Sequence, residues 1–238
     1  MYQVKEFGPE DADKVIFMFS GLGVRYWQLN LPGLPLWSFR RSGWRVVFYQ
    51  YSWDVMSSVE TYMGTLKAVY ADAEQRLKVL PTDTRVAVFG LSWGSLAATR
   101  LAASFKRVEA LILNVPYSDP IVHLYDFKPT RRIPAPAKYT KKFLGSTEAG
   151  ASFGKAIAAY APYHRAKDMG HLRVMLFFAH KDKFFLPKYM RKLCTALQKH
   201  AKEFEFSESE NFGHTLGASK YNFQSGKWLR WLDRHPSS

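Results

Sequence analysis

Ser92 is the residue whose surroundings most clearly indicate chemistry. It is the centre of a G-x-S-x-G motif, Gly90 to Gly94, which follows the apolar run 86–89 directly and precedes a helical pattern from residue 96. A strand, a sharp turn and a helix in this order hold a serine in a strained conformation with its hydroxyl exposed above a sheet. The two glycines have a steric reason, because a side chain at either position would clash where strand and helix nearly touch.

A serine in this position needs partners to act as a nucleophile. Its hydroxyl reacts poorly until a base removes the proton, and imidazole, with a pKa near neutrality, can take that proton and later return it to the leaving group. A carboxylate on the far ring nitrogen holds the required imidazole tautomer. The oxyanion that forms on the substrate needs hydrogen-bond donors. The motif therefore predicts acyl transfer, provided that the fold supplies these groups.

The order of elements along the chain predicts an α/β protein. Short apolar runs alternate with longer stretches of helical periodicity, which is typical of crossover units that feed a mostly parallel sheet. The expected strands are residues 15–19, 44–49, 86–89, 110–113, 174–178 and 204–206. Because most of these runs are continuously apolar, we expect a mostly parallel central sheet with helices on both faces.

Helices are expected after most of these strands. The apolar stripe from Val59 to Leu77 predicts a long helix, with Ser57 and Glu60 spaced as a capping box and Pro81 beyond its end. Further helices are expected over residues 96–105, 189–200 and 220–232. Residues 118–170 interrupt the rhythm with five prolines and short helical fragments. We interpret this segment as a small insertion, and residues 1–117 and 171–238 as the core of a single domain.

The motif and its setting resemble the nucleophile elbow of the α/β-hydrolase fold family, which includes serine esterases and lipases, and the resemblance extends over nearly the whole chain. In that family the acid follows the strand after the cap, where Asp182 stands here, and the histidine comes last, after the final strand, where His214 stands. The resemblance implies a catalytic triad of Ser92, Asp182 and His214. Two alternatives stay open: Asp119 could supply the carboxylate, and His180 competes with His214.

The resemblance also implies an oxyanion hole and a cap. In the family one donor is the backbone N–H after the nucleophile, here that of Trp93, and the second comes from the loop after an early strand, here Leu22 or Gly23. Relatives often have His-Gly in that loop, whereas this chain has Ser20-Gly21, a change that backbone donors tolerate. Residues 118–170 would form the cap. The aromatic residues expected to line the pocket are Tyr26, Trp27, Trp93, Tyr117, Tyr125 and Phe127.

Composition places the chain among ordinary globular proteins. It has 238 residues, 47% hydrophobic and 23% charged, a length that suits one α/β domain. We see no secretory signal in the first residues and no transmembrane run, so a cytoplasmic protein is expected. With a lone Cys194 and no histidine pair at ligand spacing, we predict no metal and no cofactor.

The charge is less ordinary, because 34 Lys and Arg against 20 Asp and Glu leave a net charge of +14. No dense basic run or nucleic-acid motif accompanies it, so we expect a solvated surface and no nucleic-acid partner. The predicted activity is hydrolysis of a small-molecule carboxylic ester through an acyl-enzyme. Thioester, lactone or amide cleavage on the same triad remains open, as does a non-catalytic basic binding protein built on a hydrolase fold.

Overall fold

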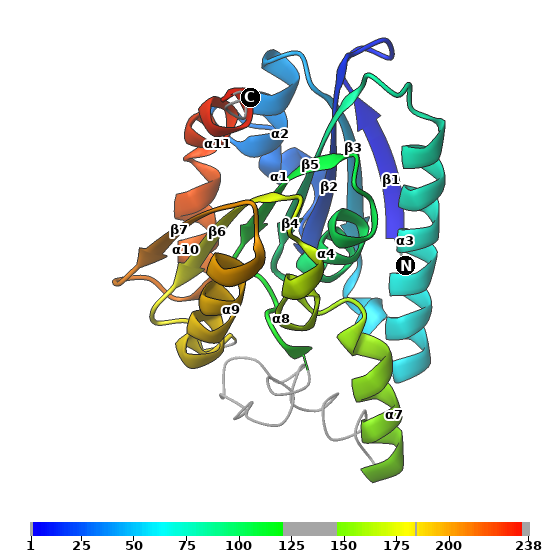
Figure 1. Cartoon of the computed structure of the whole chain (residues 1–238), viewed down its shortest axis with the longest axis vertical. Helices are drawn as coiled ribbons and strands as arrows, with labels where there is room; N and C mark the ends of the chain where they lie inside the picture. Colours follow the sequence, from blue (N-terminus) through cyan, green and yellow to red (C-terminus); the bar gives the residue numbers. More distant parts are fainter. Residues whose placement is uncertain (1, 121–146, 184, 235–238) are drawn as a thin grey trace.

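One seven-stranded sheet forms the centre of the computed structural model, which describes residues 2–120, 147–183 and 185–234 (Figure 1). The strands are β1 (Tyr2–Phe7), β2 (Lys14–Leu22), β3 (Arg45–Tyr51), β4 (Arg85–Leu91), β5 (Val108–Asn114), β6 (Arg173–Ala179) and β7 (Glu203–Ser209). Their order is β1-β3-β2-β4-β5-β6-β7, and every pairing is parallel except that of β1 with β3. The carboxyl ends of β2 to β7 therefore meet at one edge of the sheet.

Helices cover both faces of this sheet. The α-helices are α1 (Tyr26–Leu29), α2 (Pro35–Arg41), α3 (Val59–Val79), α4 (Ser95–Ser104), α7 (Thr147–Ala158), α8 (Pro162–Arg165), α9 (Pro187–His200), α10 (His214–Asn222) and α11 (Ser225–Asp233). In the part of the chain that the structure describes, three 3-10 turns accompany them, η1 (Trp53–Met56), η2 (Ser92–Gly94) and η3 (Ala166–Asp168). One core contains residues of α3, α4, α7 and α9, and the other contains residues of α1, α2, α10 and α11. The predicted α/β architecture is confirmed.

Three expectations about the elements need correction. Strand β1 was not expected; its residues are only half-buried at the sheet edge, so they lack the continuous apolar run that marks the inner strands. The cap of α3 is Ser58, whose hydroxyl accepts the Thr61 N–H at 3.1 Å, and not Ser57. The helix expected over residues 220–232 is two helices, because α10 ends at Asn222 and α11 begins at Ser225.

The described second half of the segment 118–170 packs into the main core. Phe153 and Ile157 of α7, together with Tyr160, are buried in the same cluster as the inner side chains of α3 and α4. The ring of Phe153 lies edge-on to that of Tyr62 on α3, with 5.6 Å between centroids. Residues 121–146 lie outside the described residues, and so do the expected pocket residues Tyr125 and Phe127.

Two arginines at the starts of strands hold the last helix against the sheet. Arg85 of β4 donates to the Leu232 carbonyl at 2.7 Å. Arg173 of β6 donates to the carbonyls of Trp231 and Arg234. The last carbonyls of a helix have no partner within the helix, so these guanidinium groups satisfy acceptors that would otherwise need water. They anchor α11, whose tryptophans fill the core on that face.

Candidate active site

Ser92 occupies the strained turn between β4 and α4. Its φ is 51°, in the left-handed region that non-glycine residues rarely adopt. A Cβ added at Gly90 would lie 2.7 Å from the Cα of Ser95 and from the Cβ of Ala98, so α4 can approach β4 this closely only over a glycine. A Cβ at Gly94 would collide with the backbone carbonyls of β2. Gly90 thus has the predicted steric role, whereas the constraint on Gly94 comes from the neighbouring strand β2.

Ser92, His214 and Asp182 form a continuous chain of hydrogen-bonding contacts. The Oγ of Ser92 lies 3.0 Å from Nε2 of His214, and Nδ1 of His214 lies 2.7 Å from Oδ2 of Asp182. A carboxylate can only accept, so Nδ1 carries the hydrogen and leaves Nε2 to accept from the serine hydroxyl. This is the tautomer that a general base at Ser92 requires.

The Asp182 carboxylate is buried and has partners on both oxygens. Its side chain is 3% exposed, and its Oδ1 accepts the backbone N–H of Phe185 at 2.9 Å while Oδ2 contacts His214. A buried carboxylate is stable only when it is hydrogen-bonded or paired. The loop after β6 therefore turns back on itself to hold this side chain against the imidazole.

The two alternatives raised by the sequence lie elsewhere. Asp119, after β5, has its Oδ2 3.5 Å from Nε2 of His164 on α8. His180 lies 2.6 Å from Oε1 of Glu208 on β7, and its side chain is 45% exposed. The geometry thus joins Ser92 to His214 and Asp182, and it joins Asp119 and His180 to other partners.

The carboxyl end of β2 lies beside the serine, as an oxyanion hole requires. A Cβ added at Gly21 would be 3.4 Å from the Cβ of Ser92. The N–H of Gly23 donates to the Tyr51 carbonyl at 2.9 Å, so it is already engaged. This contact favours Leu22 over Gly23 as the candidate donor beside Trp93, whose N–H immediately follows the nucleophile.

One aromatic ring contacts the histidine, and a second stacks on the first. The ring of Phe185 lies edge-on to that of His214, with 4.7 Å between centroids, and the ring of Tyr117 stacks on Phe185 at 4.7 Å. The backbone N–H of Tyr117 donates to Oγ of Ser95 at 2.9 Å, which ties it to the start of α4. Burial, followed by the nearby Asp119, raises the pKa of Tyr117, so this phenol stays neutral at physiological pH. Tyr117 was predicted at the site, and Phe185 was missed.

The other expected pocket residues have different surroundings. The indole of Trp93 is buried against the ring edges of Tyr51 and Tyr62, so its side chain belongs to the core although its backbone follows the nucleophile. The ring of Tyr26 lies 5.7 Å from that of Phe7 and 3.8 Å from the Lys5 ammonium. Trp27 is 55% exposed.

Sequence reasoning also missed Trp53. This side chain of η1 is 57% exposed, and a Cβ added at Gly23 would lie 2.5 Å from its indole nitrogen. The φ of Gly23 is +73°, so the glycine provides both the backbone conformation and the room for the indole. No sequence signal pairs these two residues, because the contact depends on where β2 and β3 end.

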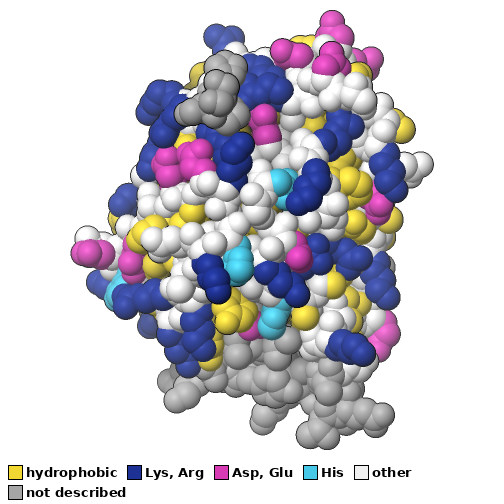
Figure 2. All heavy atoms as spheres, viewed as in Figure 1, with side chains coloured by type: hydrophobic (Ala, Val, Ile, Leu, Met, Phe, Trp, Pro, Cys, Tyr) yellow, Lys and Arg dark blue, Asp and Glu magenta, His cyan; other side chains and the backbone are white. Residues whose placement is uncertain are grey.

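The surroundings of the site are rich in positive charge. Between residues 180 and 200 the sequence has six Lys and Arg residues and one acid, the buried Asp182. In Figure 2 the Lys and Arg side chains are spread over the visible face outside the grey residues.

Within the described residues there is no group of three or more His, Cys, Asp or Glu that could hold a metal ion. Those same residues include no helix long and apolar enough to span a membrane.

The fold is that of α/β hydrolases of known structure. The structure is similar to a monoacylglycerol lipase from Paleococcus ferrophilus, with a TM-score of 0.59, 14% identity and coverage of 98% of this chain and 100% of the other. It is also similar to the Pyrococcus furiosus esterase Pf2001 (TM-score 0.58, 13% identity, 97% and 90% covered). A third similar structure is the α/β hydrolase MGS-MChE2 from a lagoon-sediment metagenome (TM-score 0.55, 17% identity, 98% and 96% covered).

This chain therefore has the α/β-hydrolase fold. Its sequence matches no protein-family profile, and a comparison with curated proteins finds no match.

Proposed function

We propose that this protein is a serine hydrolase that cleaves carboxylic esters of small molecules through an acyl-enzyme, without a cofactor. The observation that carries the proposal is the unbroken contact from Ser92 through His214 to the buried Asp182. The strained φ of Ser92, held by a turn that only glycines permit, adds support, because such strain is concentrated at functional sites. The similar esterase and lipase structures support the same class of reaction.

The reaction would proceed in two steps on these groups. Nε2 of His214 takes the proton of Ser92 as Oγ attacks the ester carbonyl. The new oxyanion then accepts hydrogen bonds from the backbone N–H groups of Trp93 and Leu22. The carbon–oxygen bond to the alcohol then breaks, and the imidazolium gives its proton to the leaving oxygen. In the second step His214 deprotonates a water molecule, which attacks the acyl-enzyme carbonyl. The bond to Oγ then breaks, the imidazolium returns its proton to Oγ of Ser92, and the acid is released. Asp182 stays ionised throughout and stabilises the imidazolium.

A fluorophosphonate probe tests the nucleophile directly, because only an activated serine is labelled. We expect wild-type protein to be labelled and to hydrolyse 4-nitrophenyl esters. Ser92→Ala should stay folded, escape labelling and lose at least about 10³-fold in kcat/KM. Ser104→Ala, at the exposed end of the same helix, is the matched control. Labelling of Ser92→Ala, or turnover close to wild type, would contradict the assignment.

The class of acyl substrate needs a separate panel. The triad is shared by esterases, thioesterases, lactonases and amidases, and the pocket decides among them. Wild-type kcat/KM should be compared on 4-nitrophenyl esters of increasing acyl length, a thioester, a lactone and an anilide. We expect the esters to be cleaved fastest. A thioester or lactone preferred by more than about tenfold (1.4 kcal/mol in the barrier) would move the assignment to that class.

A further inference from the structure

Three aromatic rings lie in a row at the carboxyl ends of three adjacent strands. Tyr117 follows β5, Phe185 follows β6 and His214 follows β7, and these strands are neighbours in the sheet. The ring of Tyr117 stacks on that of Phe185, with 4.7 Å between centroids and 23° between planes. The ring of Phe185 meets the imidazole of His214 at 4.7 Å and 89°. Each strand thus contributes one ring to the edge of the sheet that carries Ser92.

Phe185 contacts both the acid and the base of the proposed triad. Its backbone N–H donates to Oδ1 of Asp182 at 2.9 Å, and its ring lies edge-on to that of His214. A centroid separation of 4.7 Å is near the short end of the range for edge-on aromatic rings, so a water molecule does not fit between them. One buried residue therefore holds the acid through its backbone and covers the base through its side chain.

The ring beside the imidazole restricts a motion that the hydrogen bond to the acid leaves free. The contact of Nδ1 of His214 with Oδ2 of Asp182 fixes one ring nitrogen, but the imidazole can still pivot about it. Such a pivot moves Nε2 out of line with Oγ of Ser92, which lies 3.0 Å away. A misplacement of about 1 Å can lower the rate of a reaction about 10²-fold. The ring of Phe185 occupies one side of the imidazole and so limits the pivot.

The second ring connects this contact back to the turn that holds the nucleophile. The N–H of Tyr117 donates to Oγ of Ser95 at 2.9 Å, and Ser95 is the first residue of α4. The contacts therefore close a circuit, which runs through Ser92, His214, Phe185, Tyr117 and Ser95. The position of the base relative to the nucleophile is thus set by two routes. The aromatic route does not depend on the proton that moves between them.

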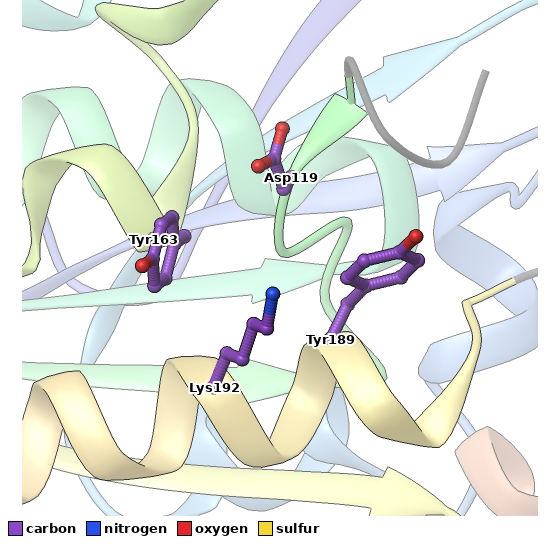
Figure 3. A pocket seen from close by; sticks show the side chains of 4 residues that line it. All are labelled: Asp119, Tyr163, Tyr189 and Lys192. Atoms are coloured by element: carbon purple, nitrogen blue, oxygen red, sulfur yellow. The ribbon is translucent and has the colours of Figure 1, made fainter. Parts of the chain in front are cut away.

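Asp119, two residues beyond Tyr117, has different surroundings. It lines a small pocket together with residues of α8 and α9, namely Tyr163, Tyr189 and Lys192 (Figure 3). The ring of Tyr163 lies edge-on to that of His164, with 5.4 Å between centroids. Tyr163 is therefore an aromatic residue of the same region that stands outside the row of three rings, and it offers a matched control.

From this circuit we propose that Phe185, backed by the ring of Tyr117, is a positioning residue for the general base His214. The ring keeps the imidazole in line with the nucleophile and keeps water from the hydrogen bond between the imidazole and the acid. The proposal rests on the proposed ester hydrolysis and adds to it a device that aligns the base.

Replacing the Phe185 ring tests the proposal while the backbone donor to the acid stays in place. Phe185→Leu keeps both the N–H and an apolar side chain. We expect kcat/KM on 4-nitrophenyl acetate and the rate of fluorophosphonate labelling to fall about 10- to 100-fold, because the imidazole is less well aligned with Ser92. Tyr163→Leu should stay within about twofold of wild type in both measurements. Wild-type rates in Phe185→Leu, or an equal loss in Tyr163→Leu, would overturn the proposal.

Tyr117→Leu tests the same device from the other ring and leaves Phe185 in place. We expect a smaller loss of kcat/KM, about three- to tenfold, since the ring of Phe185 remains but has lost its stacking partner. The double variant should lie within about twofold of Phe185→Leu alone, because Tyr117 acts through Phe185. Losses that multiply in the double variant would mean that the two rings act separately, which would overturn the role assigned to Tyr117.

A spectroscopic measurement separates positioning from catalysis. The proton on Nδ1 of His214 should give a low-field NMR signal in wild-type protein and in Tyr163→Leu, and exchange with water should broaden this signal in Phe185→Leu. Urea unfolding of the three proteins checks that each is fully folded during the measurement. If the wild type neither hydrolyses esters nor is labelled, but the signal is lost only in Phe185→Leu, the proposed function is rejected and the positioning role is supported. Ester hydrolysis with the same signal in wild type and Phe185→Leu would reject the positioning role alone.

Discussion

One oxygen of the Asp182 carboxylate contacts the imidazole of His214 and the other accepts the Phe185 N–H, whereas Asp119 contacts His164. We expect Asp182→Asn to lower kcat by about 10³-fold or more on a simple 4-nitrophenyl ester, because the amide no longer stabilises the imidazolium or holds the required tautomer. Asp119→Asn should stay within about threefold of wild type, a change of less than about 0.7 kcal/mol in the barrier. Steady-state kinetics of the two variants decides, and the reverse ranking would move the acid to the end of β5.

The same comparison can be made for the base. His214→Ala should lose about as much activity as Ser92→Ala, because members of such a triad act as a unit. His180→Ala removes only an exposed contact with Glu208 and should keep nearly wild-type kcat/KM. Fluorophosphonate labelling rates for the two variants check this independently of the substrate. Greater damage from His180→Ala would mean that the base has been misplaced.

The three proposed triad residues could be predicted because each follows a strand that is itself easy to recognise. The side chains around them could not. Trp93 has its backbone beside the nucleophile, but its indole turns into the core toward Tyr51 and Tyr62. Phe185 contacts the imidazole because its own N–H binds Asp182, a turn geometry that no residue type announces. Position along the chain thus indicates which strand end a residue occupies, and not the direction of its side chain.

At the scale of elements, buried strands and the long helix α3 were predictable because continuous apolar runs and a helical stripe mark them. Strand β1 and the break after Asn222 were not. The edge strand is half-buried and has a weaker pattern, and residues on both sides of the break retain helical spacing. Local patterns detect elements that the core covers, and they are less informative at edges and between consecutive helices.

The elbow as an element makes a prediction about stability. Gly94→Ala places a methyl group against the carbonyls of Phe19 and Ser20, which belong to sheet backbone and cannot move aside. We expect a loss of about 3 kcal/mol or more in the free energy of unfolding, within the range of severe overpacking.

Gly64→Ala on α3 is the matched control, because nothing lies within 4 Å of the added methyl group. Alanine is the better helix former, so this change should stabilise the protein by about 0.5–1 kcal/mol. Urea unfolding of both variants measures the difference. A Gly94→Ala protein as stable as wild type would show that the approach of the elbow to β2 is not tight.

At the scale of the whole molecule, the net charge of +14 makes a prediction about rates. Exposed charges attract an anionic substrate over distances that salt screens beyond about 8 Å at physiological ionic strength. The kcat/KM of an anionic ester should therefore fall as ionic strength rises, while a neutral ester of the same acyl group is nearly unaffected. Parallel salt titrations on the two esters measure this. Indistinguishable curves would show that the net charge does not attract the anionic substrate.

The core that α2 and α11 cover has a consequence for the newly made chain. The hydroxyls of Ser38 and Ser225 are 2.7 Å apart, and Trp228 and Trp231 fill the core beneath α11. On a ribosome, strands β2 to β6 emerge well before residues 225–233, so the part of the sheet face that α11 covers stays open to water until that helix has been made. A message truncated before codon 225 would yield a polypeptide with exposed aromatic rings, a form suited to capture by chaperones and to degradation.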